Sequence, residues 1–204
     1  MASKMKIVSK LDLVYPIKYN YWWRGLYMAN KGTIQIETER LILRKFTMED
    51  AEDVYNNWTS DDDVSRYVRW STHKNIEETR EYLKNVLDKY EKNVDFEWGI
   101  TLKSTGELIG AIAAFVSEEG GYEIGYNIAK KHWRNGYTTE ALKGVMNYLI
   151  NDVGIKHFIC SHAKLNPASG AVMRKVGFKY AKDTVVEKHD KSVKFDTMEY
   201  YLDV

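Results

Sequence analysis

The sequence predicts an α/β domain in which a mixed β-sheet lies between layers of helices. Segments with strand character and segments with helical periodicity follow one another along the 204 residues, an order typical of such a domain. Near the middle, the turn KSTGE joins the stretches FEWGITL and LIGAIAAFV, which is a hairpin signal. Further on, the clearest apolar stripe at helical spacing predicts a helix packed on that sheet; its members are Ala141, Leu142, Val145, Met146, Leu149, Ile150 and Val153.

The first half of the predicted domain supplies a strand, two helices and a meander. Residues 34–46, IQIETERLILRKF, predict the strand. Thr47 is the expected N-cap of a helix over 47–58, whose first turn contains acidic residues. Helical spacing predicts a second helix over 76–90. The strands of the meander are expected at 96–102, 108–116 and 121–128.

The second half alternates helices with strands and closes on a hairpin. Gly154 stands where the C-terminal cap of the striped helix belongs. A strand is expected over 156–163, and a short helix then begins with Asn166 as its cap and Pro167 in its first turn. The two closing strands are expected near 184–188 and 193–202.

The charges of the chain are balanced overall but uneven along it. The 30 Lys and Arg residues against 29 Asp and Glu produce no overall field that would attract nucleic acid or an anionic membrane. Residues 1–33 contain six basic residues and one acid, a net charge of +5. Residues 34–204 therefore carry +1 minus +5, or −4.

Residues 1–33 form a basic, aromatic N-terminal extension ahead of the domain predicted over 34–204. Its aromatic residues are too many for an ordinary disordered tail: Tyr15, Tyr19, Tyr21, Trp22, Trp23 and Tyr27. We expect the extension to pack on the domain, or on a second copy of the chain in a homodimer. One alternative is an upstream segment ahead of a start at Met28. Another is an arm that docks RNA or the ribosome by stacking and phosphate contacts.

The single cysteine, Cys160, excludes an internal disulfide and argues against a zinc cluster of Cys and His. Its apolar neighbours in HFIC predict a small buried core residue rather than a reactive thiol. No apolar run reaches the ~18 residues of a membrane helix, and the N-terminus lacks the apolar region and cleavage site of a signal peptide. We therefore expect a cytoplasmic protein without a bound metal.

The stretch WRNGYTTE leads into the striped helix. The first backbone N–H groups of a helix have no intrahelical partner and lie at the positive end of its dipole, so this approach offers an anion site. Gly136 would let a phosphate lie close against the chain. An ordinary tight turn before a helix is the commoner explanation of a single glycine. The spacing matches neither the Walker loop nor the dinucleotide fingerprint.

Several stretches in a fixed order carry a family resemblance: IETERLILR, GELIG, YEIGYNIAKKHWRNGYTTEAL, NPASGAVMRKVGF and the closing strands. Together they resemble the GNAT N-acetyltransferases, and within these the RimJ/RimL branch, whose members acetylate ribosomal-protein N-termini, other amino groups, polyamines or antibiotics. The resemblance covers about residues 34–202. It implies a mixed, mostly antiparallel sheet with a splayed pair of strands, helices on both faces, and acetyl-CoA as the acyl donor.

The resemblance also implies where the phosphates of CoA bind. The family's pyrophosphate loop falls on residues 133–138 and the helix start, so the cofactor-binding residues would include Arg134, Asn135, Gly136, Tyr137, Thr138 and Thr139. The branch commonly has GKGYATEA where this chain has RNGYTTEA. Arg134 and Thr138 thus replace small residues, and Arg134 could itself pair with a phosphate.

The strand GYEIGYNI is the one that splays in this family, and the pantetheine arm of acyl-CoA inserts beside it. Backbone groups near Asn127, Ile128 and Ala129 would pair with the pantetheine amides, by the logic of strand addition. In NPASGAVMRKVGF, Asn166 would contact the same arm and Ser169 would lie near the thioester sulfur. Alternatively, Ser169 simply bonds the backbone at a helix start.

The implied reaction needs a base for the amine more than an acid for the leaving thiolate. A lysine-like amine titrates near ~10.4, whereas the CoA thiol resembles cysteine at ~8.5. Glu123 matches the glutamate before IGY in the branch and is the first candidate base; Glu97 is the second. A solvated strand glutamate is the alternative for Glu123. The tyrosine that many GNAT enzymes use as general acid is Met173 here, which leaves Ser169 or water for that role.

Four further polar residues can be explained without a catalytic role. His132 is expected at the surface, and His162 ends a strand, where a hydrogen-bonded scaffold role is commoner than proton transfer. Arg44 and Arg66 either face an acceptor or belong to a charged surface.

We therefore predict an acetyl-CoA-dependent N-acetyltransferase that acts on a primary amine by direct attack, without a covalent enzyme intermediate. The charge of −4 over residues 34–204 mildly favours a cationic acceptor such as a peptide N-terminus, a polyamine or an aminoglycoside. The alternative from a different class is a catalytically silent acyl-CoA-binding or interaction module, which Met173, Arg134 and Thr138 favour.

Overall fold

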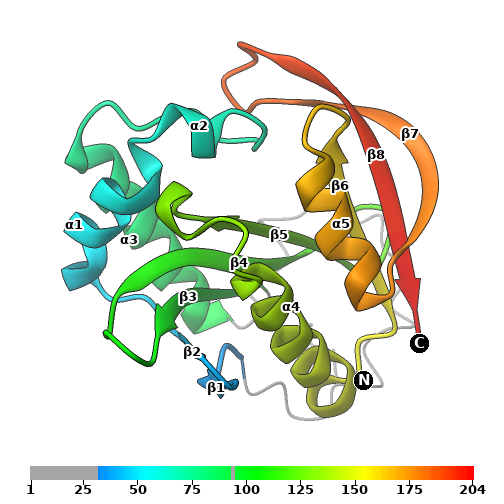
Figure 1. Cartoon of the computed structure of the whole chain (residues 1–204), viewed down its shortest axis with the longest axis horizontal. Coiled ribbons are helices and arrows are strands. Elements are labelled where there is room, and N and C mark those ends of the chain that lie inside the picture. The colour runs from blue at the N-terminus through cyan, green and yellow to red at the C-terminus, as the bar shows by residue number, and fades with distance from the viewer. Residues whose placement is uncertain (1–31, 93–94) are drawn as a thin grey trace, which may run out of the picture.

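The computed structural model describes residues 32–92 and 95–204 (Figure 1). In these ranges the strands form a single mixed sheet in the order β1-β2-β3-β4-β5-β6-β8-β7. Neighbouring strands are antiparallel except β5 and β6, which are parallel. The bounds are β1 Ile36–Glu37, β2 Leu41–Arg44, β3 Phe96–Leu102, β4 Leu108–Val116, β5 Tyr122–Ile128, β6 His157–Ala163, β7 Lys179–Glu187 and β8 Lys194–Asp203. The predicted mixed, mostly antiparallel sheet is confirmed.

Helices cover both faces of this sheet, which confirms the predicted layers (Figure 1). One face carries α1 (Ala51–Val54) and α3 (Ile76–Lys92), with the short α2 (Asp62–Ser65) at its edge. The other carries α4 (Tyr137–Tyr148) and α5 (Pro167–Val176). Short 3-10 or π turns adjoin these helices at Met48–Asp50, Tyr55–Thr59, Lys130–His132 and Leu149–Val153.

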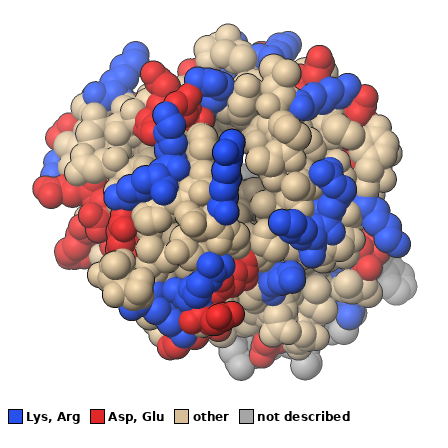
Figure 2. Space-filling model, in the orientation of Figure 1, with Lys and Arg blue, Asp and Glu red and all other residues tan. Residues whose placement is uncertain are grey.

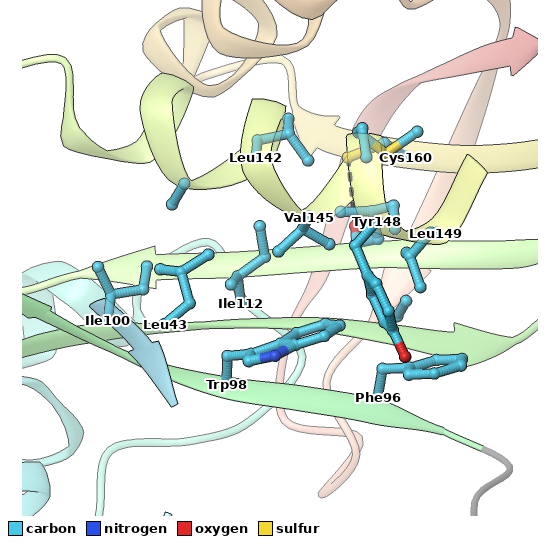
Figure 3. Packing of buried hydrophobic residues seen from close by; sticks show 14 of the residues in the cluster. Leu43, Phe96, Trp98, Ile100, Ile112, Leu142, Val145, Tyr148, Leu149 and Cys160 are labelled. Carbon is cyan, nitrogen blue, oxygen red and sulfur yellow. Dashed lines mark hydrogen bonds between the residues drawn. The ribbon is translucent and has the colours of Figure 1, made fainter. Parts of the chain in front are cut away.

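The larger core cluster lies between the sheet and α4 (Figure 3). Phe96 and Trp98 of β3 stack with ring centroids 6.0 Å apart, and the Tyr148 ring meets both edge-on. Cys160 is 1% exposed within this cluster, so the prediction of a buried core cysteine is confirmed. Burial raises the pKa of its thiol, which keeps it protonated and unreactive.

The structure divides the strand predicted over 34–46 into β1 and β2, which pair with each other. The chain turns between them because the Thr38 N–H donates to the Leu41 carbonyl at 3.0 Å, while the Leu41 N–H donates to the Thr38 hydroxyl at 3.1 Å. A polar side chain that bonds the backbone nearby competes with a continuous strand. The prediction of one uninterrupted strand was therefore wrong, and α2 was not predicted at all.

The helix ends follow the predicted caps. Asn166 caps α5 with Pro167 in its first turn, and Gly154 closes the π turn after α4 at a φ of 83°. Thr47 and Asp50 form a capping box before α1. Because these caps depend on the backbone needs of single positions, they can be found without tertiary information.

The predicted N-terminal extension over 1–33 lies outside the described residues, apart from its last two. Tyr148 donates its hydroxyl to the Gly32 carbonyl at 2.6 Å, and the Glu97 N–H donates to the Thr33 hydroxyl at 3.2 Å. Gly32 and Thr33 therefore belong to the packed domain.

The strands β5 and β6 begin as neighbours and then separate, which confirms the predicted splayed pair. Their pairing consists of Tyr122 with Phe158 and Glu123 with Ile159, although both strands continue for several residues. At the next position the Cys160 thiol donates to the Ile124 carbonyl at 3.2 Å (Figure 3), where a backbone bond would otherwise continue the ladder.

Gly170 decides how closely α5 approaches β6. A Cβ at this position would lie 2.3 Å from Nε2 of His162. The imidazole is 6% exposed, its Nδ1 lies 2.8 Å from the Ala163 carbonyl, and its Nε2 lies 3.4 Å from the Tyr200 hydroxyl. The scaffold role predicted for His162 is confirmed, and the ring cannot move without losing these partners.

We predict that Gly170→Ala destabilises the protein by about 1–3 kcal/mol, the usual cost of overpacking. The loss would appear although alanine is intrinsically better than glycine in a helix by about 1 kcal/mol. Urea unfolding measures it. The double variant Gly170→Ala, His162→Ala should lose less than the sum of the single variants, since it removes the clash. Additive losses would show that the close approach is not the cause.

Candidate active site

The edge of β5 that β6 leaves uncovered is the centre of the candidate site. The Ala129 N–H donates to the Ile109 carbonyl of β4 at 2.8 Å. Backbone groups alternate in direction along an antiparallel strand, so those of Asn127 also face β4, whereas those of Tyr126 and Ile128 point toward β6. Because β6 has turned away, no strand of the described chain lies beside Tyr126 and Ile128. This edge can take an extended ligand by strand addition.

The pairing of β5 with β4 limits the backbone groups that a ligand can reach near the predicted residues Asn127, Ile128 and Ala129. The Ala129 N–H is already bonded, and the Ile128 carbonyl accepts the indole N–H of Trp133 at 2.7 Å. The Ile128 N–H and both backbone groups of Tyr126 remain directed into the gap. The side-chain Oδ1 of Asn127 is buried and has no hydrogen-bond partner within the described ranges.

The loop before α4 leaves the N-terminus of this helix uncovered. The residues from Trp133 to Gly136 are exposed, and Gly136 is the N-cap at a φ of 79°. A glycine has no side chain that could cap the first N–H groups, which belong to Tyr137, Thr138 and Thr139. These donors and the helix dipole form an anion site. Figure 2 shows Lys and Arg side chains on this face, around the start of α4 and over α5.

A carboxylate one turn into α4 ties the loop to the turn between β1 and β2. Glu140 accepts from the Thr38 hydroxyl at 2.6 Å and from the N–H and Nε of Arg40, each at 2.7 Å. Arg40 also donates to the Asn135 carbonyl at 3.1 Å and lies 4.6 Å from the centre of the Tyr137 ring. The predicted loop residues Asn135 and Tyr137 are therefore held by Arg40, which no sequence pattern singled out.

A second carboxylate anchors the segment just before the loop. Glu107, in the turn between β3 and β4, pairs with Lys131 Nζ at 2.5 Å and lies 3.2 Å from Nε2 of His132. The His132 side chain is 16% exposed. The expected surface position of His132 holds in part, because its ring contacts Glu107 and is partly covered.

Arg134 adopts a left-handed backbone conformation, with a φ of 65°. Residues other than glycine rarely adopt it, because the Cβ crowds the backbone at a cost of about 1–2 kcal/mol. The resemblance places a glycine here in related chains, so this chain keeps the glycine conformation with an arginine. Arg134 is exposed and lies two residues before the N-cap Gly136.

Two hydroxyls meet where α5 begins. Asn166 accepts the Ser169 N–H at 3.4 Å, and the Tyr126 hydroxyl lies 3.0 Å from both the Ser169 hydroxyl and the Ser169 carbonyl. A carbonyl oxygen only accepts, so Tyr126 donates its proton there and accepts the Ser169 proton. Burial raises the pKa of Tyr126 well above its ordinary value, which keeps the phenol neutral.

The position of the missing tyrosine on α5 is filled by Met173, which is fully buried in the core. Tyr126 instead brings a phenol from β5 to Ser169, which lies one turn before Met173 on α5. The sequence placed Tyr126 on one face of a strand but offered no signal that this face meets Ser169.

The candidate base lies on the opposite face of the sheet. Glu123 alternates with Tyr126 along β5, and its Oε1 accepts from the Arg69 guanidinium at 2.9 Å. Burial raises the pKa of this carboxyl, while the charge of Arg69 opposes the rise. The side chain of Glu123 is 29% exposed, so a ligand can still reach it.

The second candidate base is enclosed. Glu97 is 8% exposed under α3 and accepts the phenol proton of Tyr82. Burial raises the pKa of the Glu97 carboxyl. Its closed surroundings make it a weaker candidate than Glu123 for contact with an incoming amine.

The two arginines that the sequence left undecided have carboxylate partners. Arg44 forms a bidentate pair with Asp50 at 2.8 and 2.7 Å, and Arg66 pairs with Asp63. Both arginines thus take part in ion pairs, which agrees with the interpretation of a charged surface.

The described residues contain no group of three or more His, Cys, Asp or Glu side chains that could hold a metal ion. Within the same ranges no helix is long and apolar enough to cross a bilayer.

Comparisons with known proteins identify the family. The acetyltransferase (GNAT) domain family matches residues 40–179. The uncharacterized N-acetyltransferase YoaA of Bacillus subtilis (strain 168) is 32% identical over 171 residues, 82% of this chain and 95% of that protein. A GNAT-family acetyltransferase structure from Bacillus anthracis has a TM-score of 0.71 at 26% identity, over 83% of this chain and 98% of that one. The chain belongs to the GNAT acetyltransferases, whose acyl donor is acetyl-CoA.

A more distant structure shares the fold. RimL, the ribosomal L7/L12 α-N-protein acetyltransferase, in complex with coenzyme A, has a TM-score of 0.74 at 16% identity, over 84% of this chain and 98% of that one. The resemblance to the RimJ/RimL branch thus extends to the arrangement of the fold.

We predict that Arg134→Gly stabilises the free protein by up to about 1 kcal/mol, because it removes the left-handed strain but gives the unfolded chain more freedom. The same variant should bind CoA a few-fold more weakly, since the guanidinium no longer meets a phosphate. Chemical unfolding and calorimetric titration with CoA measure the two effects.

Arg134→Ala is the matched control, because it loses the guanidinium and keeps the strained φ. It should weaken CoA binding as much as the glycine variant does, without the gain in stability. Unchanged CoA affinity in both variants would exclude a phosphate contact by Arg134.

Proposed function

We propose that this protein transfers the acetyl group of acetyl-CoA to a primary amine by direct attack within a ternary complex. The observation that carries the proposal is the uncovered edge of β5 beside the open N-terminus of α4. The pantetheine arm would lie along Tyr126 and Ile128, and the pyrophosphate against the loop from Arg134 to Gly136. The thioester would then sit in the gap, with an acceptor on one side and α5 on the other.

On the acceptor side, Glu123 would remove the proton that the amine loses. An amine near ~10.4 is mostly protonated at neutral pH, so a base must act directly or through water. The raised pKa of Glu123 makes it a stronger base than an ordinary surface carboxylate. The amine nitrogen bonds to the thioester carbon, the C–S bond breaks, and the amine proton passes to the carboxylate.

On the side of α5, the hydroxyl pair would meet the leaving thiolate. In the free protein, the Ser169 hydroxyl would donate its hydrogen bond to the Tyr126 oxygen. The same hydroxyl could turn toward the sulfur as negative charge develops there. A thiolate near ~8.5 needs this proton less than an alkoxide would, so a hydroxyl can suffice in place of the missing tyrosine. Tyr126 would act as a positioning residue that holds the Ser169 hydroxyl in place at the start of α5.

The acceptor class follows from the branch and from the charge of the domain. We propose a peptide N-terminus, such as that of a ribosomal protein, a polyamine, an aminoglycoside or another small amine. The shared fold with RimL, an α-N-protein acetyltransferase of ribosomal L7/L12, supports an N-terminal amine among these.

We predict that Glu123→Gln lowers kcat by about 10²–10⁴-fold, the usual contribution of a general base, and leaves CoA affinity unchanged. In the wild type, kcat/KM should fall as the pH drops through the raised pKa of Glu123, above the ordinary value of about 4.3. The sign follows because only the deprotonated carboxylate accepts a proton. A pH profile of thiol release measures both effects.

Glu187→Gln is the control, because Glu187 pairs with Lys194 and does not contribute to the raised pKa of Glu123. It should keep its turnover. A silent acyl-CoA-binding module would bind CoA, release no thiol with any amine, and change in neither variant. Normal turnover in Glu123→Gln would assign the base to another group.

We predict that Tyr126→Phe and Ser169→Ala each lower kcat by about tenfold, with CoA affinity within a few-fold of the wild type. The double variant should lose little more than either single one, because the two hydroxyls act as one unit. Steady-state kinetics and CoA titration provide the test. Full additivity of the two losses would mean that Tyr126 does not act through Ser169.

A further inference from the structure

Arg69 lies where the acceptor amine must arrive. Its guanidinium is 2.9 Å from Oε1 of Glu123, although the two residues are 54 positions apart. Arg69 belongs to the loop between α2 and α3, which lies over the same face of the sheet as Glu123. The Arg69 guanidinium therefore occupies the carboxylate oxygen of Glu123 that the incoming amine would have to contact.

The backbone around Arg69 is held in place by the hairpin of β7 and β8. Lys188 is 8% exposed and donates its ammonium to the carbonyls of Ser65 at 3.0 Å and Trp70 at 3.1 Å. The His189 N–H donates to the Arg69 carbonyl at 2.8 Å. A buried lysine directed at carbonyl oxygens is costly unless these bonds persist. The loop is thus clamped on both sides of Arg69, and the guanidinium has a fixed base.

Most of the hydrogen-bonding capacity of Arg69 is unused. Within the described ranges its side chain makes one hydrogen bond, to Glu123, and it is 46% exposed. A guanidinium carries further N–H donors in a planar fork that matches a carboxylate in bidentate geometry. Arg69 can therefore accept an anionic group of a ligand without leaving the clamped loop.

The nearby charged residues Lys182, Glu119 and Glu199 do not compete with Arg69 for an anionic group of the acceptor. Lys182 pairs with Glu119 and Glu199, each at 3.2 Å. Glu119 and Glu199 raise the pKa of Glu123 more weakly than burial does. Among the residues that the structure describes, Arg69 is thus the cation paired with Glu123.

An acceptor that carries both an ammonium and a carboxylate can replace the ion pair of Arg69 and Glu123 and still give each side chain a partner of opposite charge. Its amine would take the place of Arg69 at Glu123, and its carboxylate would take the place of Glu123 at Arg69. An acceptor that is only cationic would displace Arg69 from Glu123 and leave the guanidinium without an anion. On the basis of the proposed acetyl transfer, we propose that the acceptor is an amine with a nearby carboxylate, which Arg69 binds.

Such a carboxylate can come from a free α-amino acid or from the side chain of an acidic first residue in a peptide. The test compares matched acceptors with and without that carboxylate: L-leucine against L-leucinamide, and Asp-first against Asn-first peptides. Thiol release from acetyl-CoA is measured with the full-length wild type, Arg69→Gln and the control Arg66→Gln. Arg66 pairs with Asp63 and not with Glu123.

We expect the wild type and Arg66→Gln to favour the carboxylate member of at least one pair by about tenfold or more, mainly through KM. Arg69→Gln should lose this preference. The α-amino group of L-leucinamide has a lower pKa than that of L-leucine, so more of it is unprotonated at neutral pH. This difference alone would favour the amide, which is the opposite of the expected preference. The pair that shows the preference distinguishes free amino acids from acidic N-termini.

Equal use of both members by the wild type, or a preference that survives in Arg69→Gln, would overturn the inference. Absence of thiol release with every amine would instead count against the proposed acetyl transfer. Calorimetric titration of the same pairs into CoA-saturated protein then decides the inference by itself. Tighter binding of the carboxylate member, lost in Arg69→Gln, supports it; equal binding of both members overturns it.

Discussion

The separation of β5 from β6 after Glu123 and Ile159 is the constraint on which the rest of the site depends. A continuous ladder would consume the backbone groups of Tyr126 and Ile128, and no extended ligand could bind there. Two contacts on the face of the sheet that carries α4 and α5 border the gap. The Cys160 thiol takes the Ile124 carbonyl at its start, and α5 is drawn onto β6 through Gly170, which has no Cβ to strike His162.

The anion site illustrates how polar contacts shape a loop that has no regular structure of its own. Glu140 joins the start of α4 to Thr38 and Arg40, while Glu107 holds Lys131 and His132 from another turn. These contacts hold the backbone of the loop in place, including the left-handed Arg134.

The chemistry expected of the site is distributed over the two faces of β5. Residue alternation along the strand puts Glu123 on the face covered by the Arg69 loop and Tyr126 on the face covered by α5. Under the proposed reaction, a base on one face would act on the amine and the hydroxyl pair on the other face would act on the leaving thiolate, without neutralising each other.

The sequence by itself determined the features that depend on neighbouring residues: the order of helices and strands, the caps at Asn166 and Gly154, the buried cysteine and the exposed start of α4. Tertiary structure alone decided the partners. Arg69 and Glu123 are 54 positions apart, Tyr126 and Ser169 are 43 apart, and Thr38 and Glu140 are 102 apart. Local propensity carries no information about such pairs, because they form only when packing of the whole sheet brings distant segments together.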